Sequence, residues 1–320
     1  MLPLAVLAMT PEARRSFEAF EQRAESGDPE AMYRLSAILE KGFDSIPADT
    51  ARSLSMLRRS AAAGYAPAQN YLGFLFEKGD ILPANADSAR YYVRRAADQG
   101  DAIAAHNLAF MLLNHDDDPA NDSTALVYLQ QGVEAGLPQS ITLLADLEAE
   151  GRLIPADTLK AIGLYERAIA KGFGDAEVRL LNMMGPHWQA FNSHDALKQA
   201  VRYWSMGAPT IAVELLHLVG PMERETPRAY ALLGHAYSRG QGAPYDHHRA
   251  NEYFARAALL GNPSAQFILA ETLEIFPDAL RDLLPDLPVS MTPDALRRAA
   301  ADAGISTAEE ATAALLAPID

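Results

Sequence analysis

The chain of 320 residues contains no cysteine, so disulfides, thiolate nucleophiles and zinc–thiolate sites are excluded. Basic residues are scarce as well: 27 Lys and Arg stand against 42 Asp and Glu, which gives a net charge of −15. Because an acidic surface repels phosphate backbones, this balance argues against nucleic-acid binding. Aromatic residues make up only 8% of the chain. Small residues are plentiful instead, and they favour close helix-on-helix packing.

Long hydrophobic runs are also missing, and we expect no membrane span. Residues 1–9 are nearly all apolar. One interpretation is a truncated secretory signal, in which Val6-Leu7-Ala8 resembles a cleavage site; the other is a segment packed on the first helix. The compartment therefore stays open between the cytoplasm and, if the segment is a signal, a periplasmic or secreted location.

A glycine recurs with a period of about 36 residues. These register glycines are Gly27, Gly64, Gly100, Gly136, Gly172 and Gly207. Glycine suits the left-handed turn that ends one helix, and the Asp, Asn and Pro residues that often follow suit the start of the next. Eight residues after each register glycine stands a leucine, usually beside a small residue: Leu35, Leu72, Leu108, Leu144, Leu180 and Leu215. This pattern predicts the buried stripe of a first helix, A.

A second signal has the same period. It consists of Pro47-Ala48-Asp49, Pro83-Ala84-Asn85, Pro119-Ala120-Asn121 and Pro155-Ala156-Asp157. The Asp or Asn of each copy is predicted to cap a second helix, B. Each repeat is then a hairpin of helices A and B. An isolated hairpin cannot bury its apolar face, so consecutive hairpins are expected to stack on one continuous core.

The pattern breaks down between residues 173 and 225. Residues 183–186, Met-Met-Gly-Pro, stand where a helix A should end, and Ser193 stands at the expected cap position. The next clear register glycine is Gly261, one and a half periods after Gly207. We therefore predict an irregular or kinked repeat, then one extra helix at residues 210–219, then a new helix A at residues 228–239.

Residues 233–262 carry a family resemblance. Leu233-Gly234-His235-Ala236-Tyr237, the Gly240-Gln241-Gly242 loop and Asp246 resemble the Sel-one-like repeat, a relative of the tetratricopeptide repeat. The resemblance covers roughly residues 24–274. It implies an all-α fold, a right-handed α-solenoid superhelix of tandem antiparallel helix hairpins.

The ends of such an array need capping helices. We expect residues 1–23 to form an N-terminal segment and capping helix, residues 24–274 the repeats, irregular near 173–225, and residues 275–320 a helical C-terminal cap. Thr10 and Pro11 are predicted to start the leading helix. Ser306 with Glu309 is predicted to form a capping box for the last one.

Motifs of catalysis and of phosphate binding are missing from the sequence. His115-Asp116-Asp117-Asp118 is rich in oxygen ligands but lacks the spacing of an EF-hand loop, so an ordinary acidic loop is expected. His247 and His248 are adjacent on a predicted helix and point to different faces. We therefore predict no metal, no cofactor and no catalytic residue.

One further set of positions varies between repeats while the leucines do not. These positions lie six and ten residues after the register glycines, and they hold Tyr33, Asn70, Phe74, His106, Phe110, Asp146, His217 and His235. Varied aromatic and polar groups on the concave face of a solenoid suit peptide recognition. Some of them, Phe74 and Phe110 in particular, could equally be core residues.

The resemblance implies a non-enzymatic protein–protein interaction scaffold or adaptor that binds a segment of a protein or peptide partner in its concave groove. Two alternatives stay open. One is a hydrolase of the β-lactam-binding type reported for cysteine-rich relatives, whose cysteines this chain lacks. The other is a structural assembly protein. The oligomeric state stays undetermined.

Overall fold

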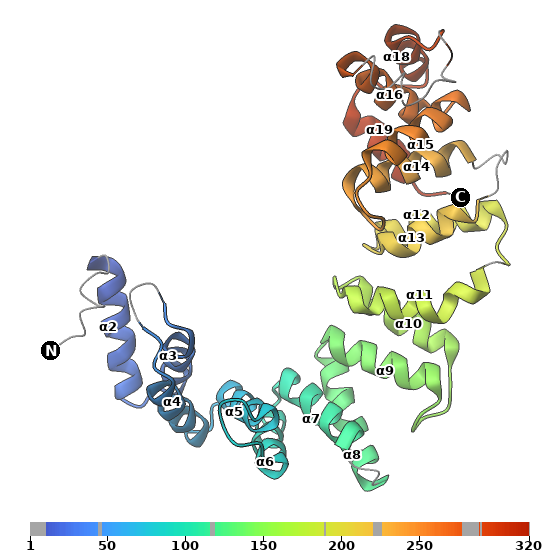
Figure 1. Cartoon of the computed structure of the whole chain (residues 1–320). Helices are drawn as coiled ribbons and strands as arrows, with labels where there is room; N and C mark the ends of the chain where they lie inside the picture. Colours follow the sequence, from blue (N-terminus) through green and yellow to red (C-terminus); the bar gives the residue numbers. More distant parts are fainter. Residues whose placement is uncertain are drawn as a thin grey trace. The chain divides into compact units, whose positions relative to one another are not determined.

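The computed structural model of the chain describes residues 11–43, 47–115, 119–188, 190–219, 226–276, 288 and 290–319. Its elements are α-helices joined by short loops (Figure 1), which confirms the all-α, helix-hairpin solenoid fold. No helix among the described residues is long and apolar enough to cross a membrane. The chain divides into two compact units, and each is described by itself. Unit 1 comprises Met1–Leu147 and Gly151–Pro155, and unit 2 comprises Glu148–Glu150 and Ala156–Asp320.

Unit 1 opens with a leading helix and continues as hairpins. Its helices are α2 (Pro11–Glu25), α3 (Pro29–Lys41), α4 (Thr50–Ala62), α5 (Ala66–Lys78), α6 (Ala86–Ala97), α7 (Ala102–His115), α8 (Pro119–Glu134) and most of α9 (Pro138–Glu150). Helices α3, α5, α7 and α9 are A helices, and α4, α6 and α8 are B helices. Each A helix from α3 to α7 packs against the B helix that follows it. The predicted leading helix is confirmed from Pro11 onwards, while Thr10 lies outside the described residues.

Unit 2 contains the irregular stretch and the C-terminal helices. Its helices are α10 (Thr158–Ile169), α11 (Gly174–Trp188), α12 (Ser193–Ser205), α13 (Pro209–His217), α14 (Thr226–Arg239), α15 (His247–Leu259), α16 (Pro263–Ile275), α18 (Pro293–Asp302) and α19 (Ala308–Leu316). Helix α13 is the predicted extra helix: no B helix follows it, and it contacts α12, α11 and the next A helix, α14. Helices α18 and α19 pack against α16, and Arg228 donates hydrogen bonds to the carbonyl oxygens of Leu315 and Ala317 at the end of α19.

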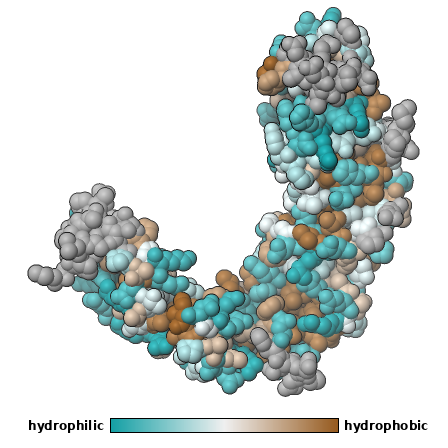
Figure 2. All heavy atoms as spheres, viewed as in Figure 1, coloured by the Kyte–Doolittle hydropathy of each residue, from teal (hydrophilic) through white to brown (hydrophobic). Residues whose placement is uncertain are grey.

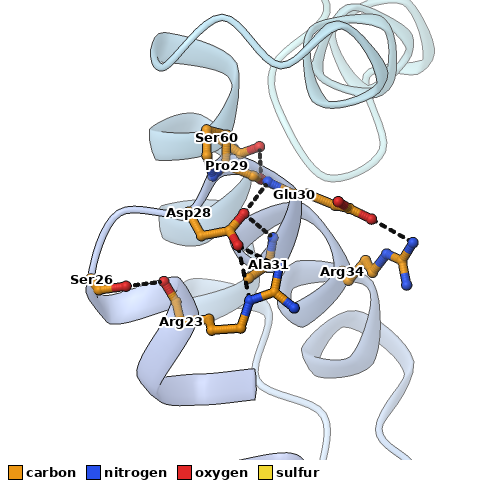
Figure 3. Close-up of polar contacts among 8 residues, drawn as sticks. All are labelled: Arg23, Ser26, Asp28, Pro29, Glu30, Ala31, Arg34 and Ser60. Carbon is orange, nitrogen blue, oxygen red and sulfur yellow. Dashed lines mark hydrogen bonds and ion pairs between the residues drawn. The ribbon is translucent and has the colours of Figure 1, made fainter. Parts of the chain in front are cut away.

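The register glycines adopt the predicted left-handed conformation, with φ between 76° and 98°. At the first of these turns, Asp28 caps α3: its carboxylate accepts hydrogen bonds from the backbone N–H groups of Glu30 and Ala31, both at 3.1 Å (Figure 3). These bonds and the Arg23 guanidinium lower the pKa of Asp28. The hydroxyl of Ser60 on α4 donates to the carbonyl of Pro29 at 2.6 Å, which ties the following B helix to this same turn.

The recurring Asp or Asn before helix B has two roles. Its side chain accepts from the backbone N–H three residues later, at 2.8–3.0 Å for Asp49, Asn85, Asp157 and Asp246. Its own N–H donates to a carbonyl near the end of the preceding A helix, at 2.7–3.0 Å. The cap therefore starts helix B and fixes the loop to helix A at the same time. The motif Pro119-Ala120-Asn121 differs: Asn121 was predicted to cap helix α8, but α8 already begins at Pro119 and Asn121 lies inside it.

Three further expectations about helix ends were wrong. Helix α11 does not end near residues 183–186 but runs through Gly185 and Pro186 to Trp188. Helix α12 is capped by Asn192 rather than Ser193, because it is the Asn192 side chain that accepts from the N–H of Asp195. The capping box of α19 is built one residue later than predicted: Thr307 pairs with Glu310, whose carboxylate also accepts from Ser306.

The small residue after the buried leucine marks the contact between helices A and B. A Cβ added to Gly73 on α5 would lie 2.5 Å from Cγ2 of Val93 and 3.0 Å from the carbonyl oxygen of Ala89, both on α6. At Gly234 the corresponding atom would lie 2.8 Å from the Phe254 ring. At Gly73 and Gly234, the small residue beside the buried leucine is therefore the place where the two helices of a hairpin approach each other.

Candidate partner-binding site

Consecutive A helices of unit 1 bring together five of the predicted site residues, two on each of α5 and α7 and one on α3: Tyr33, Asn70, Phe74, His106 and Phe110. Leu35, Leu72 and Leu108 are fully buried. The site residues stand two positions before or after these leucines, which is more than half a helical turn away from the buried stripe. We call this set the A-helix ladder. Phe74 and Phe110 are 39% and 48% exposed, so both are surface residues and not core.

The first part of the ladder is a group of aromatic rings. The ring of Tyr33 lies 5.6 Å from that of Tyr65 and 6.5 Å from that of Tyr71. Tyr71 is stacked with Phe74 at 6.0 Å. These separations are typical of favourable aromatic pairs. The group joins α3 to α5 and packs against the exposed ring of Phe74. In the space-filling view, hydrophobic residues interrupt the hydrophilic surface around α4 and α5 (Figure 2).

Charged groups surround these rings. The hydroxyl of Tyr71 donates a 2.6 Å hydrogen bond to the carboxylate of Glu40 at the end of α3. Burial and then this carboxylate raise the pKa of Tyr71. Burial also raises the pKa of Tyr33, and the nearby Tyr65, Asp101 and Glu40 raise it further. The ammonium group of Lys78 lies 5.7 Å from the centre of the Phe74 ring.

The second part of the ladder joins α5, α7 and α9. The side-chain amide of Asn107 donates to Oδ1 of Asn70 at 3.0 Å. Nδ1 of His106 lies 3.3 Å from the hydroxyl of Ser140, and its ring stacks with that of Phe110 at 6.4 Å. Burial lowers the pKa of His106, because it disfavours the charged imidazole.

Two residues that contact the ladder were missed in the sequence, Tyr71 and Asn107. Both stand seven positions after a register glycine, where they contact position six of the preceding repeat: Tyr71 meets Tyr33, and Asn107 meets Asn70. The signal that could have identified them is a pair of aromatic or amide residues separated by one period plus one residue. A search at the repeat period alone passes over such pairs.

The remaining predicted site residues have different surroundings. Asp146 is half-buried on α9, and His217 is exposed at the last position of α13 in unit 2. His235 is only 5% exposed and was wrongly placed on an accessible face. The physical reason is that α14 packs against α13, α15 and α19 and is buried along most of its length. The imidazole of His235 lies 5.7 Å from the ring of Trp204 on α12.

The burial of His235 predicts a pH dependence of stability. Burial, with a smaller effect of Arg239, lowers its pKa from 6.5 to about 4. Since the folded state disfavours the protonated imidazole, the contribution of His235 is fully present above pH 6.5 and is lost as the pH falls from there to about 4. The loss should reach about 3 kcal/mol.

This expectation is tested by urea unfolding of the wild type and of His235→Phe across that pH range. Phenylalanine keeps an aromatic ring against Trp204 and removes the titrating group. We expect the wild type to lose more unfolding free energy on acidification than the variant does. Parallel losses in the two proteins would show that His235 is not the group responsible.

The histidines and acidic residues considered as metal ligands form no cluster in the part of the chain that the structure describes. His247 and His248 are exposed at the first two positions of α15. Nε2 of His247 lies 3.4 Å from the side-chain amide nitrogen of Asn251. The acidic loop at residues 116–118 lies outside the described residues.

Stacked helix hairpins with a ladder of varied side chains on the A helices define a helical-repeat protein. The model of the Sel1 repeat matches residues 29–65, 66–101, 102–137, 138–173 and 227–262, which is more than half of the sequence. The chain therefore belongs to the Sel1 repeat family, as its resemblance to the Sel-one-like repeat predicted. The matches leave out residues 174–226, where helix α13 interrupts the alternation of A and B helices.

One solved structure with an SLR fold agrees with the fold of this chain. A protective antigen present in uropathogenic Escherichia coli strains, which displays an SLR fold, is 21% identical with a TM-score of 0.50, over 93% of this chain and 58% of the antigen. The chain thus spans little more than half the length of that protein. A Sel1 repeat protein from Oxalobacter formigenes is 19% identical with a TM-score of 0.45, over 88% of both chains. No curated protein matches the sequence. Sel1 repeat proteins are generally non-enzymatic scaffolds that mediate protein interactions.

Proposed function

We propose that this protein is a non-enzymatic protein–protein interaction scaffold and that the A-helix ladder of unit 1 binds a segment of a partner protein. The observation that carries the proposal is the pair of exposed rings, Phe74 and Phe110, at equivalent positions of consecutive repeats. Each is held by a neighbouring ring, Tyr71 or His106, at 6.0 and 6.4 Å. Rings held in this way contribute contact area to a complex and lose little side-chain entropy when a partner binds.

The spacing of the ladder suits an elongated ligand. Its members belong to three successive A helices, and contacts between side chains link each helix to the next. A peptide that crosses these helices meets a ring, an amide pair and a second ring in turn. This repeated surface, with one set of contacts in each repeat, supports recognition of an extended or helical segment.

The test is capture of partners by the full chain and by a Phe74→Ala, His106→Ala, Phe110→Ala triple variant, with quantitative mass spectrometry. We expect the triple variant to lose the specific partners and to keep the helicity of the wild type. The matched control is Tyr91→Ala with Val127→Ala, because these residues are 54% and 68% exposed on B helices of the same unit. Equal capture by the triple and control variants would refute the ladder as the binding surface. Turnover of a β-lactam above background would contradict a non-enzymatic role.

A further inference from the structure

Charge is distributed unevenly among the helices α4 to α7 of unit 1. Helix α7 contains no Asp, Glu, Lys or Arg, and Lys78 is the only basic residue on α5. The B helices α4 and α6 carry many arginines instead: Arg52, Arg58, Arg59, Arg90, Arg94 and Arg95. A cationic partner is therefore repelled by α4 and α6 and meets a single positive charge on α5 and α7. On the neighbouring α3, Arg34 is paired with Glu30.

The environment of Phe74 suits a cation. An aromatic ring attracts a positive charge placed over its face, such as that of an arginine or lysine side chain. Lys78 already lies over this ring, which shows that the position can be reached by a cation from the solvent side. The neighbouring Tyr71 hydroxyl is bonded to Glu40, so a carboxylate stands beside the stacked pair.

We propose that the occupant of the A-helix ladder is a basic segment of a partner protein, with an arginine side chain stacked on the Tyr71–Phe74 pair and its guanidinium beside Glu40; this rests on the function proposed above. Arginine fits better than lysine, because its planar group can stack on a ring and donate to a carboxylate at the same time. On binding, it displaces the exposed Lys78 from the ring of Phe74.

The ring of Phe110 then contacts a different kind of side chain of the partner segment, an apolar one. His106 stacks with Phe110, and burial disfavours a positive charge on its imidazole. The exposed half of Phe110 offers contact area to an apolar residue of the same segment. The ladder therefore selects a segment in which basic and apolar residues alternate. The chain's net charge of −15 attracts such a segment over longer distances.

The probe is a short labelled peptide in which arginine alternates with leucine, and binding to the full chain is measured by fluorescence anisotropy at low and high salt. Companion peptides carry glutamate or glutamine in place of arginine. We expect tight, salt-sensitive binding of the arginine peptide alone. Glu40→Gln should weaken that binding about fivefold, and Lys78→Gln should strengthen it by removing the competing cation. Phe74→Ala should weaken it as well.

The charge-matched control is Asp87→Asn, which removes one negative charge from an exposed position on α6. We expect it to leave the affinity nearly unchanged. Equal weakening by Glu40→Gln and Asp87→Asn would overturn the proposal, because binding would then follow net charge alone. Equal binding of the glutamine peptide would overturn the basic segment as the occupant.

Self-association of the chain that Phe74→Ala abolishes would identify a second copy as the occupant and would also overturn the proposal. The function proposed above is judged separately, by partner capture with the triple variant. If that variant loses its partners while no probe binds in a Phe74-dependent way, the scaffold function stands and only the basic segment is refuted. If capture is unchanged, the ladder itself is refuted.

Discussion

Replacing Gly242 by alanine is expected to lower the unfolding free energy of unit 2 by more than about 3 kcal/mol. Gly242 belongs to the Gly-x-Gly loop between α14 and α15, and its φ of 75° disfavours any residue with a Cβ. A Cβ at this position would also lie 2.1 Å from the carbonyl oxygen of Pro209 and 2.8 Å from the amide nitrogen of Thr210. Both are backbone atoms at the start of α13, so the loop or the helix would have to move.

Gly240 of the same loop provides the matched control. Its φ is 64°, but the nearest atom to an added Cβ is Cβ of Tyr245, at 3.5 Å, which is an ordinary contact. Gly240→Ala should therefore cost only the conformational penalty of about 1–2 kcal/mol. Denaturant unfolding followed by circular dichroism compares the two variants. Equal losses would mean that the backbone conformation alone, and not the approach to α13, requires glycine at residue 242.

Replacing Leu108 by alanine is expected to cost about 2–5 kcal/mol. Leu108 is fully buried in the core that α6, α7 and α8 share, in a cluster with Val93, Leu129 and Leu147. In a stacked array, a cavity at this point weakens the packing within one hairpin and also the packing of the next hairpin against it. The unfolding transition of unit 1 should shift to lower denaturant concentration.

Leu35→Ala tests whether the effect of the same substitution depends on the position of the repeat in the array. Leu35 occupies the equivalent site of the first repeat and is equally buried, in a cluster with Phe17, Leu39 and Met56. Because terminal repeats open locally at lower cost, the main transition should shift less for Leu35→Ala, while hydrogen exchange in α2 and α3 should rise. Identical shifts would indicate that unit 1 unfolds as one block, with no difference between its end and its middle.

Local signals in the sequence were sufficient to place helix ends where a single residue type meets one requirement of the backbone. The register glycines end helices because their positive φ values are costly for any other residue. Asp49, Asn85, Asp157 and Asp246 cap helices because a short side-chain oxygen reaches the free N–H groups of the first turn. The errors at Ser193 and at Ser306 with Glu309 are shifts of one residue, since neighbouring polar residues compete for the same cap.

By itself, the sequence determined the helix-hairpin repeat, the extra helix α13, the family and the buried leucines except Leu144, which is only partly buried, because these depend on periodicity along one chain. Only the tertiary structure decided which residues at the variable positions are accessible. Phe74 and Phe110 remain exposed on α5 and α7, whereas His235, at an equivalent position, is buried. The physical reason is that exposure depends on which other helices cover a position. The inserted α13 and the returning α19 both pack on α14, and a period of about 36 residues holds no information about either contact.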